Sequence, residues 1–142
     1  MTPNQIKLVR ETWSNVAPIA DTAAEMFYQR LFEIDPSTKP LFSKTDMTRQ
    51  RGMLLDALGL VVKNAARIEN LSPALKELGR RHVRYGVEDH HYDSVGAALL
   101  WTLEQGLGDT FTDATRTAWT DVYTYVSSAM RHATADTGEA SA

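Results

Sequence analysis

Hydrophobic residues recur every three or four positions along most of this chain, a spacing that places them on one face of an α-helix. The first such run follows Thr2 and Pro3, a capping residue and a first-turn proline, and it ends near Pro18. A second run spans residues 19–35 and ends before Pro36, because the residue preceding a proline disfavours helix. No segment alternates with the two-residue period of a strand. The pattern therefore predicts an all-α protein.

Later runs predict further helices, separated by short breaks. Residues 36–42 are bounded by prolines and predict a single turn that delivers Leu41 and Phe42 to the core, followed by a polar loop through Asp46. Residues 67–71 form a polar connection, with Ser72 as the next cap, and residues 87–91 form a corner. The helices are expected over residues 47–66, 73–85, 92–107 and from 113 onward. We expect one domain over residues 1–134 with six to seven main helices, and a disordered tail over 135–142.

Composition and charge narrow the class of protein. With 43% hydrophobic and 23% charged residues, the 142-residue chain is typical of a globular domain and long enough to enclose a cofactor pocket. A formal charge of −3 makes it a poor nucleic-acid binder. The absence of cysteine excludes disulfides, thiolate metal sites and haem attached through Cys-x-x-Cys-His. Without a signal-like start or a long apolar run, we expect no membrane contact and a cytoplasmic protein.

The helix over residues 73–85 carries the most informative candidate. His82 follows Leu75 and Leu78 at helical spacing on the apolar stripe of an otherwise basic helix, which Gly86 is placed to end. An inward histidine is often just hydrogen-bonded to a carbonyl. Neutral imidazole is also a common ligand of transition metals and haem iron. Whether His82 is a hydrogen-bonded core residue or a metal ligand depends on the side chains that face it across the fold.

Two hypotheses of a metal enzyme without haem require residues that the sequence lacks. Glu88 and His91 form a Glu-x-x-His motif, but a ferritin-like di-iron site needs a second such motif and two more inward glutamates. A zinc hydrolase built from His82, His90 and His91 would lack the base of a His-Glu-x-x-His helix. Neither reading is favoured.

Several motifs, in order and spacing, resemble those of a globin. The main features are a proline-bounded turn ending in Leu-Phe, a glutamine-bearing helix, and a histidine on the next helix that is followed by a corner. Within that superfamily the chain is similar to single-domain bacterial globins and to the globin part of flavohaemoglobins, over about residues 6–130. The segments that carry the resemblance are Phe27–Phe32, Pro40–Phe42, Leu78–His82, Tyr85–Val87 and His91–Tyr92.

This resemblance implies a globin fold around a pocket for haem b. It implies His82 as the proximal iron ligand and Phe42 packing on the porphyrin. Tyr28, Gln50 and Leu54 would then line the distal face, where oxygen, nitric oxide or carbon monoxide binds. Val87 and Tyr92 are further expected cofactor contacts, and Arg81 is an expected partner of the haem propionates, a part that His90 or His91 could also take.

The distal residues suit a bound diatomic ligand. Oxygen draws negative charge from iron, so the Tyr28 hydroxyl and the Gln50 amide would stabilise it, each hydrogen bond contributing about 1 to 3 kcal/mol in a dry site. Leu54 would exclude water and so protect the iron from oxidation. We expect reversible ligand binding with slow release.

Two departures bear on the reaction. Flavohaemoglobins carry a reductase after the globin, whereas this sequence stops at Ala142, so turnover would need an external flavin reductase. Their proximal histidine is also polarised by a tyrosine and a glutamate, and here Tyr92 matches the tyrosine but Thr134 stands at the glutamate's position. Nitric oxide detoxification with a separate reductase is one expectation. Oxygen delivery or sensing without turnover, and a haem-free interaction module, are the alternatives.

Overall fold

The computed structural model describes the backbone of residues 1–141 and the side chains through His132. Helices account for almost all of this part of the chain, and no strand occurs in it, as the sequence predicts. The elements are α1 (Pro3–Val16), η1 (Ala17–Ile19), α2 (Ala20–Ile34), η2 (Pro36–Phe42), α3 (Met47–Lys63), η3 (Ala65–Leu71), α4 (Ser72–Arg84), α5 (Asp89–Leu107), η4 (Gly108–Thr110) and α6 (Asp113–Ser141), where η marks a 3-10 helix.

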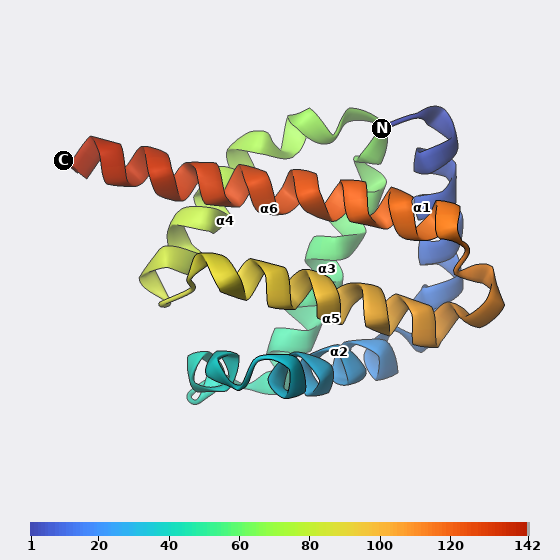
Figure 1. Cartoon of the computed structure of the whole chain (residues 1–142), viewed down its shortest axis with the longest axis horizontal. Helices are drawn as coiled ribbons and strands as arrows, with labels where there is room; N and C mark the ends of the chain where they lie inside the picture. The colour runs from blue at the N-terminus through green and yellow to red at the C-terminus, as the bar shows by residue number, and fades with distance from the viewer. Residues whose placement is uncertain (142) are drawn as a thin grey trace.

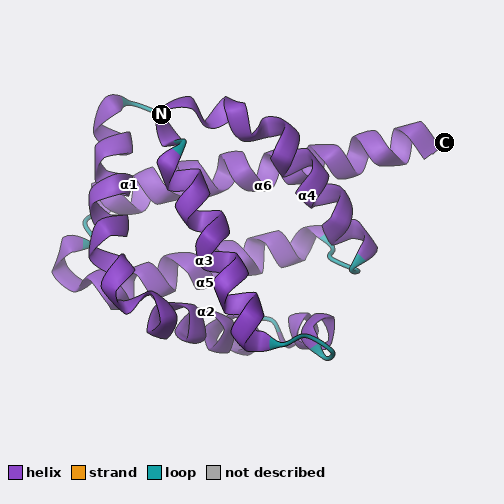
Figure 2. Cartoon of the chain, turned by 180° about the vertical axis from the view of Figure 1, so that it is seen from behind, coloured by secondary structure: helices purple, strands orange, loops and turns teal. Residues whose placement is uncertain are grey.

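The long helices stack in crossed layers. Two pairs run side by side, α4 along α6 and α2 along α5, and α3 crosses behind α5 and α6 (Figures 1 and 2). The core lies where these layers face one another and includes Phe27, Leu31, Leu99 and Trp119, all buried. The crossed arrangement leaves a space between α3 and α4 that α5 and α6 close from the opposite side, and this space holds the site described below.

Local capping fixes several helix ends as the sequence predicts. The Thr2 hydroxyl accepts the Gln5 N–H at 3.1 Å at the start of α1, and the Thr112 hydroxyl accepts the Thr115 N–H at 3.2 Å before α6. Gly86 follows α4 with φ +91°, a left-handed conformation that side chains other than glycine rarely adopt. The helix that carries His82 is therefore ended by a local signal.

Two predictions around the start of α4 were wrong. Ser72 is not the cap but the first residue of α4, and Leu71 precedes the helix without a capping side chain. Residues 67–71 are not a polar connection, because they belong to η3 and bury Ile68 and Leu71. These two apolar residues pack on the core, and their burial stabilises the helical conformation of the segment.

The corner before α5 is also shorter than predicted, since the helix begins at Asp89 rather than Tyr92. Glu88 and His91 explain this early start. The ring Nδ1 of His91 accepts the backbone N–H of Glu88 at 2.8 Å, as in a capping box. The Glu-x-x-His motif considered above as part of a metal site thus serves to begin a helix.

Two further sequence predictions concern the end of the chain. The predicted tail at 135–142 and the Thr134 side chain fall outside the side chains that the structure describes, so both remain predictions. His132, the last described side chain, is exposed. Across the described residues, none of the helices has the length and apolar character needed to cross a bilayer.

Candidate functional site

A large cavity opens among α2, η2, α3, α4, α5 and α6. Its volume is about 340 Å³, within the range of small-molecule and cofactor pockets. Its walls are mostly aliphatic and aromatic, with a few polar groups placed among them. Seven of the eight residues proposed from sequence for the cofactor line it, namely Tyr28, Phe42, Gln50, Leu54, His82, Val87 and Tyr92.

His82 reaches the cavity from α4 with its ring orientation fixed. Its Nδ1 lies 2.8 Å from the carbonyl oxygen of Leu78, and because a carbonyl can only accept, Nδ1 carries the proton. The neutral ring therefore has its lone pair on Nε2. Burial lowers the pKa of His82, an effect that the Leu78 hydrogen bond opposes and the charge of Arg81 reinforces. A neutral, oriented imidazole is the form that binds a metal.

Tyr28 and Gln50 meet on another wall of the cavity. The amide Nε2 of Gln50 on α3 donates to the hydroxyl of Tyr28 on α2 at 3.1 Å. Burial raises the Tyr28 pKa, although the Gln50 hydrogen bond and the charge of Arg51 act in the opposite direction. The hydroxyl is therefore protonated at neutral pH. Because it accepts from Gln50, its own proton is available for an acceptor inside the cavity.

Aromatic and aliphatic side chains hold this polar pair in place. The Tyr28 ring meets Phe42 edge to face at 5.5 Å between centroids, and Phe42 in turn lies 5.8 Å from Phe32. Leu54 belongs to the same stripe of α3 as Gln50, one helical turn further on. These contacts restrict the Tyr28 ring and give its hydroxyl a dry environment.

Tyr92 supplies an unusual polar atom to the cavity wall. The residue is only 7% exposed, burial raises its pKa, and its hydroxyl has no hydrogen-bond partner among the described residues. The ring is fixed by the Arg131 guanidinium at 5.0 Å from its centroid. A buried hydroxyl without a partner costs free energy, so this atom points to a ligand in the cavity.

The mouth of the cavity carries apolar residues in contact with solvent. Met53 and Leu60 line the cavity from α3, yet they are 54% and 50% exposed. Exposed apolar side chains gathered at a groove are a feature of ligand-binding sites. A broad apolar ligand fits these walls. The oriented imidazole and the unpaired Tyr92 hydroxyl add the polar groups that a haem would meet.

Arg81 is the one proposed cofactor residue that does not line the cavity. It is exposed on α4, next to His82 in sequence, and its charge reaches the His82 ring. Its predicted contact with a propionate, which would extend toward solvent, remains a prediction. His90 is exposed, whereas His91 is buried and lines the cavity.

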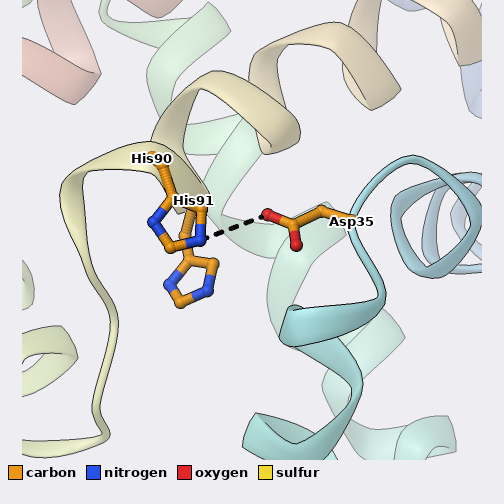
Figure 3. Close-up of side chains that lie close together, drawn as sticks. All are labelled: Asp35, His90 and His91. Atoms are coloured by element: carbon orange, nitrogen blue, oxygen red, sulfur yellow. Dashed lines mark ion pairs between the residues drawn. The ribbon is translucent and has the colours of Figure 1, made fainter.

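Asp35, His90 and His91 lie close together (Figure 3), and only His91 of the three lines the cavity. The metal-binding atoms of all three lie within 4.8 Å of one another. His90 Nε2 lies 3.6 Å from Asp35 Oδ2. His91, however, uses Nδ1 to accept the Glu88 N–H, so its proton is on Nε2, which lies 3.1 Å from the Ser37 hydroxyl. A metal would need the lone pair on that atom. The cluster is better described as a hydrogen-bonded tie between η2 and α5, and it does not include His82.

Sequence reasoning missed part of the cavity wall. Thr38 is 1% exposed and lines the cavity, but its sequence context indicated only a turn. Leu60 lies outside the stripe that the helical period defines on α3, and only the open mouth brings it to the cavity. Tyr123 could have been found, because its position on α6 follows the helical repeat of Trp119 and Val122.

The fold and the site together define a class of protein: a bundle of crossed helices around a mostly apolar cavity of cofactor size, with one oriented, neutral histidine in its wall. The globin family model matches residues 25–130, three quarters of the chain. The chain belongs to the globin family.

Relatives and a solved structure agree with this assignment. The chain is 31% identical to a flavohemoprotein of Xylella fastidiosa over 92% of its length, and 28% identical to a flavohemoprotein of Bacillus subtilis over 88%. It spans about a third of those relatives. It is 27% identical to the anaerobic nitrite reductase HBII of Casuarina glauca, covering 92% of this chain and 90% of that one. A bacterial globin structure from Campylobacter jejuni shares the fold, with a TM-score of 0.84 at 24% identity, over 97% of this chain and 99% of that one.

Haem b is the cofactor of this family, and the cavity fits it. The flat apolar porphyrin of haem b suits the aliphatic and aromatic walls of the cavity, and the haem iron suits the neutral imidazole of His82. The predicted fold, family and cofactor are thereby confirmed. Binding of a diatomic ligand to a haem globin follows from the family.

Proposed function

We propose that His82 is the axial ligand of haem b and that Tyr28 and Gln50 face the bound diatomic ligand. The observation that carries this proposal is the hydrogen-bonded pair Tyr28 and Gln50 lining the same cavity as an oriented, neutral His82. Haem b supplies an iron that takes one protein nitrogen and leaves a position for a small ligand.

The two sides of the site have different chemistry. His82 donates its Nδ1 proton to the Leu78 carbonyl, and this bond keeps Nε2 as the basic atom. Tyr28 holds its hydroxyl proton toward the cavity because Gln50 occupies its acceptor side. A ligand that gains negative charge is stabilised by such a donor in a dry site. Leu54 and Phe42 limit the entry of water.

We further propose that this site detoxifies nitric oxide. A strong donor that retains oxygen favours reaction with a second ligand over rapid release. In this reaction nitric oxide, dioxygen and one electron give nitrate, so every turnover consumes an electron. We propose a flavin reductase as its source. The support is the retentive donor pair together with similarity to flavohemoproteins.

The test mixes reduced, haem-loaded protein in oxygenated buffer with nitric oxide in a stopped-flow instrument. Stoichiometric nitrate and ferric haem are expected within the mixing time of the experiment. Adding a flavin reductase and NADH should then give several nitrates per protein. His82→Ala serves as the control, because it should lose haem during purification.

Three results would contradict these proposals. Full haem retention by His82→Ala with an unchanged absorption spectrum would refute the axial role. Slow formation of ferric haem without nitrate would refute detoxification and leave an oxygen carrier or sensor. The same conclusion would follow if no reductase restored the ferrous protein.

A further inference from the structure

The helix that carries His82 turns a strongly basic side to solvent. We call Lys76, Glu77, Arg80, Arg81 and Arg84 the α4 basic face. Glu77 lies 3.4 Å from Arg80 and 3.9 Å from Arg84, so one acid links two of the four cations. The five side chains carry a net charge of +3 in a chain whose total is −3. The α4 basic face is therefore a locally positive surface on a chain with a net negative charge.

Exposed apolar groups adjoin the α4 basic face. Tyr85, directly after α4, is 64% exposed, and Val83 is 41% exposed. The Tyr85 backbone is nonetheless fixed, because its N–H is 3.1 Å from the carbonyl oxygens of both Arg81 and His82. Tyrosine and arginine are the residue types enriched in the centres of protein interfaces. Together with the basic face, Tyr85 and Val83 form a surface with the composition of a docking site.

This surface lies directly over the axial histidine. The ring of Tyr85 is 6.1 Å from the ring of His82, centroid to centroid. His82 faces the cavity, whereas Arg81, Val83 and Arg84, its neighbours in sequence, face solvent. A protein bound here would approach the haem pocket within the thickness of one helix.

We propose that the α4 basic face with Tyr85 and Val83 docks an acidic electron-transfer protein that carries a flavin. In each encounter the reduced partner loses one electron and the ferric haem gains it. The inference rests on the proposed function, which requires one electron per turnover. It adds where the donor binds and what charge it carries.

Charge complementarity is the reason for choosing an acidic partner. Opposite charges on two proteins accelerate encounter and orient it, and salt weakens both effects. Because the chain outside this face has a net charge of −6, an acidic partner is repelled elsewhere and attracted here. The same overall negative charge disfavours nucleic acids and anionic membranes, whose charge is spread over a much larger surface.

The experiment measures the rate at which a reduced acidic flavodoxin reduces the ferric, haem-loaded protein without oxygen. The second-order rate constant should fall as salt rises. It should fall about tenfold at low salt in the double variant Arg80→Glu with Arg84→Glu, because charge steering accounts for 10- to 1000-fold in such associations. Tyr85→Ala should lower the rate at all salt concentrations.

Two controls isolate the surface from the haem site. Lys7→Glu makes the same charge reversal as either one of the two α4 substitutions, but on α1, on the opposite side of the molecule from α4 (Figure 1). It is compared with the single variant Arg84→Glu, and it should leave the rate within about twofold. Reduction by dithionite, which needs no protein docking, should be the same in all variants. Dithionite rates that differ would show damage to the haem site instead.

The proposal is wrong if the flavodoxin rate is independent of salt, or if Lys7→Glu lowers it as much as the α4 variants do. It is also wrong if the basic face binds anionic vesicles while the flavodoxin rate stays unchanged. Failure of nitrate formation in the single-turnover test would instead refute the proposed function, because that test uses no donor.

Discussion

The hydroxyl of Tyr28 is the atom on which most of the ligand chemistry depends. It accepts one hydrogen bond from Gln50, it is buried, and its pKa is raised by that burial. A phenol in this state donates a proton and does not carry a charge. The chemistry proposed for the site therefore depends on a single hydrogen atom held in position by the amide beside it.

Tyr28→Phe removes only this hydroxyl, and Gln50→Leu removes the amide that orients it. Losing one hydrogen bond of about 1 to 1.5 kcal/mol should speed oxygen dissociation about five- to tenfold in each variant. Stopped-flow displacement of oxygen by carbon monoxide measures the rate. Tyr125→Phe, which removes a hydroxyl away from the cavity, is the matched control. Rates within twofold of wild type in both cavity variants would contradict the donor role.

At the scale of elements, the contact between α4 and α6 positions His82. Gly79, one turn before His82, is where the two helices meet, and a Cβ there would lie 2.8 Å from the Cα of Met130 and closer still to its carbonyl oxygen. Neither backbone can yield without moving its helix. Glycine is therefore required at this position by packing.

Gly79→Ala should lower the free energy of unfolding by about 1 to 3 kcal/mol, because overpacking forces the helices apart. Urea unfolding of the haem-loaded protein measures the change. Gly52→Ala on α3 is the control, since a Cβ there meets nothing within 4 Å and alanine favours helix by about 1 kcal/mol. Equal stabilities of the two variants would show that the close contact between α4 and α6 tolerates a methyl group.

The tie between η2 and α5 depends on Asp35. Its Oδ1 accepts the Ser37 hydroxyl at 2.5 Å and its Oδ2 accepts the Ser94 hydroxyl at 2.8 Å. These bonds, with that of Ser37 first, lower the pKa of Asp35 below the ordinary value of 3.8. Both bonds favour the charged carboxylate.

A carboxylate whose pKa is lower in the folded state stabilises that state at pH above 3.8, and the contribution is lost as the pH falls through the lowered value. Asp35→Asn should therefore be less stable than wild type at neutral pH and lose less stability on acidification. Urea unfolding over a series of pH values measures this. Asp109→Asn, at an exposed carboxylate, should follow wild type. Parallel curves for wild type and Asp35→Asn would contradict the role of the tie.

At the scale of the whole molecule, the cavity of about 340 Å³ lies where a domain of this size would otherwise have its core. Residues from α2, η2, α3, α4, α5 and α6 meet across it. Without a ligand, these side chains have no partner atoms on one side and lose the dispersion contacts that packing provides. The folded state therefore depends on the cofactor for part of its stability.

Haem removal should lower the midpoint of urea unfolding. A ligand that binds only the folded protein adds about 4 kcal/mol at a thousandfold excess over its dissociation constant. Titrating free haem into the haem-free protein should raise the midpoint progressively, as followed by circular dichroism. The midpoint of the His82→Ala variant should rise less for the same amount of haem. A midpoint of unfolding that does not change as haem is added would show that filling the cavity does not stabilise the folded protein.

Helix positions follow from sequence because their causes are local. Thr2, Thr112 and Gly86 cap or end helices through groups only a few residues away. The apolar stripe containing Leu75, Leu78 and His82 needs only the 3.6-residue period to predict an inward histidine. Where local reasoning failed, at Ser72 and residues 67–71, burial of Ile68 and Leu71 against distant helices prevailed over the local signal.

Contacts across the cavity were decided by tertiary structure alone. The Gln50 to Tyr28 hydrogen bond spans 22 positions, and the Ser94 to Asp35 bond spans 59. The helical period predicts that each side chain points inward. It does not predict which atoms form hydrogen bonds or which remain unpaired, as the Tyr92 hydroxyl does among the described residues. The sequence by itself determined the helices, the inward histidine and the family resemblance. Tertiary structure decided the orientation of His82, the donor pair and the open apolar mouth, because these depend on the distances and angles between helices.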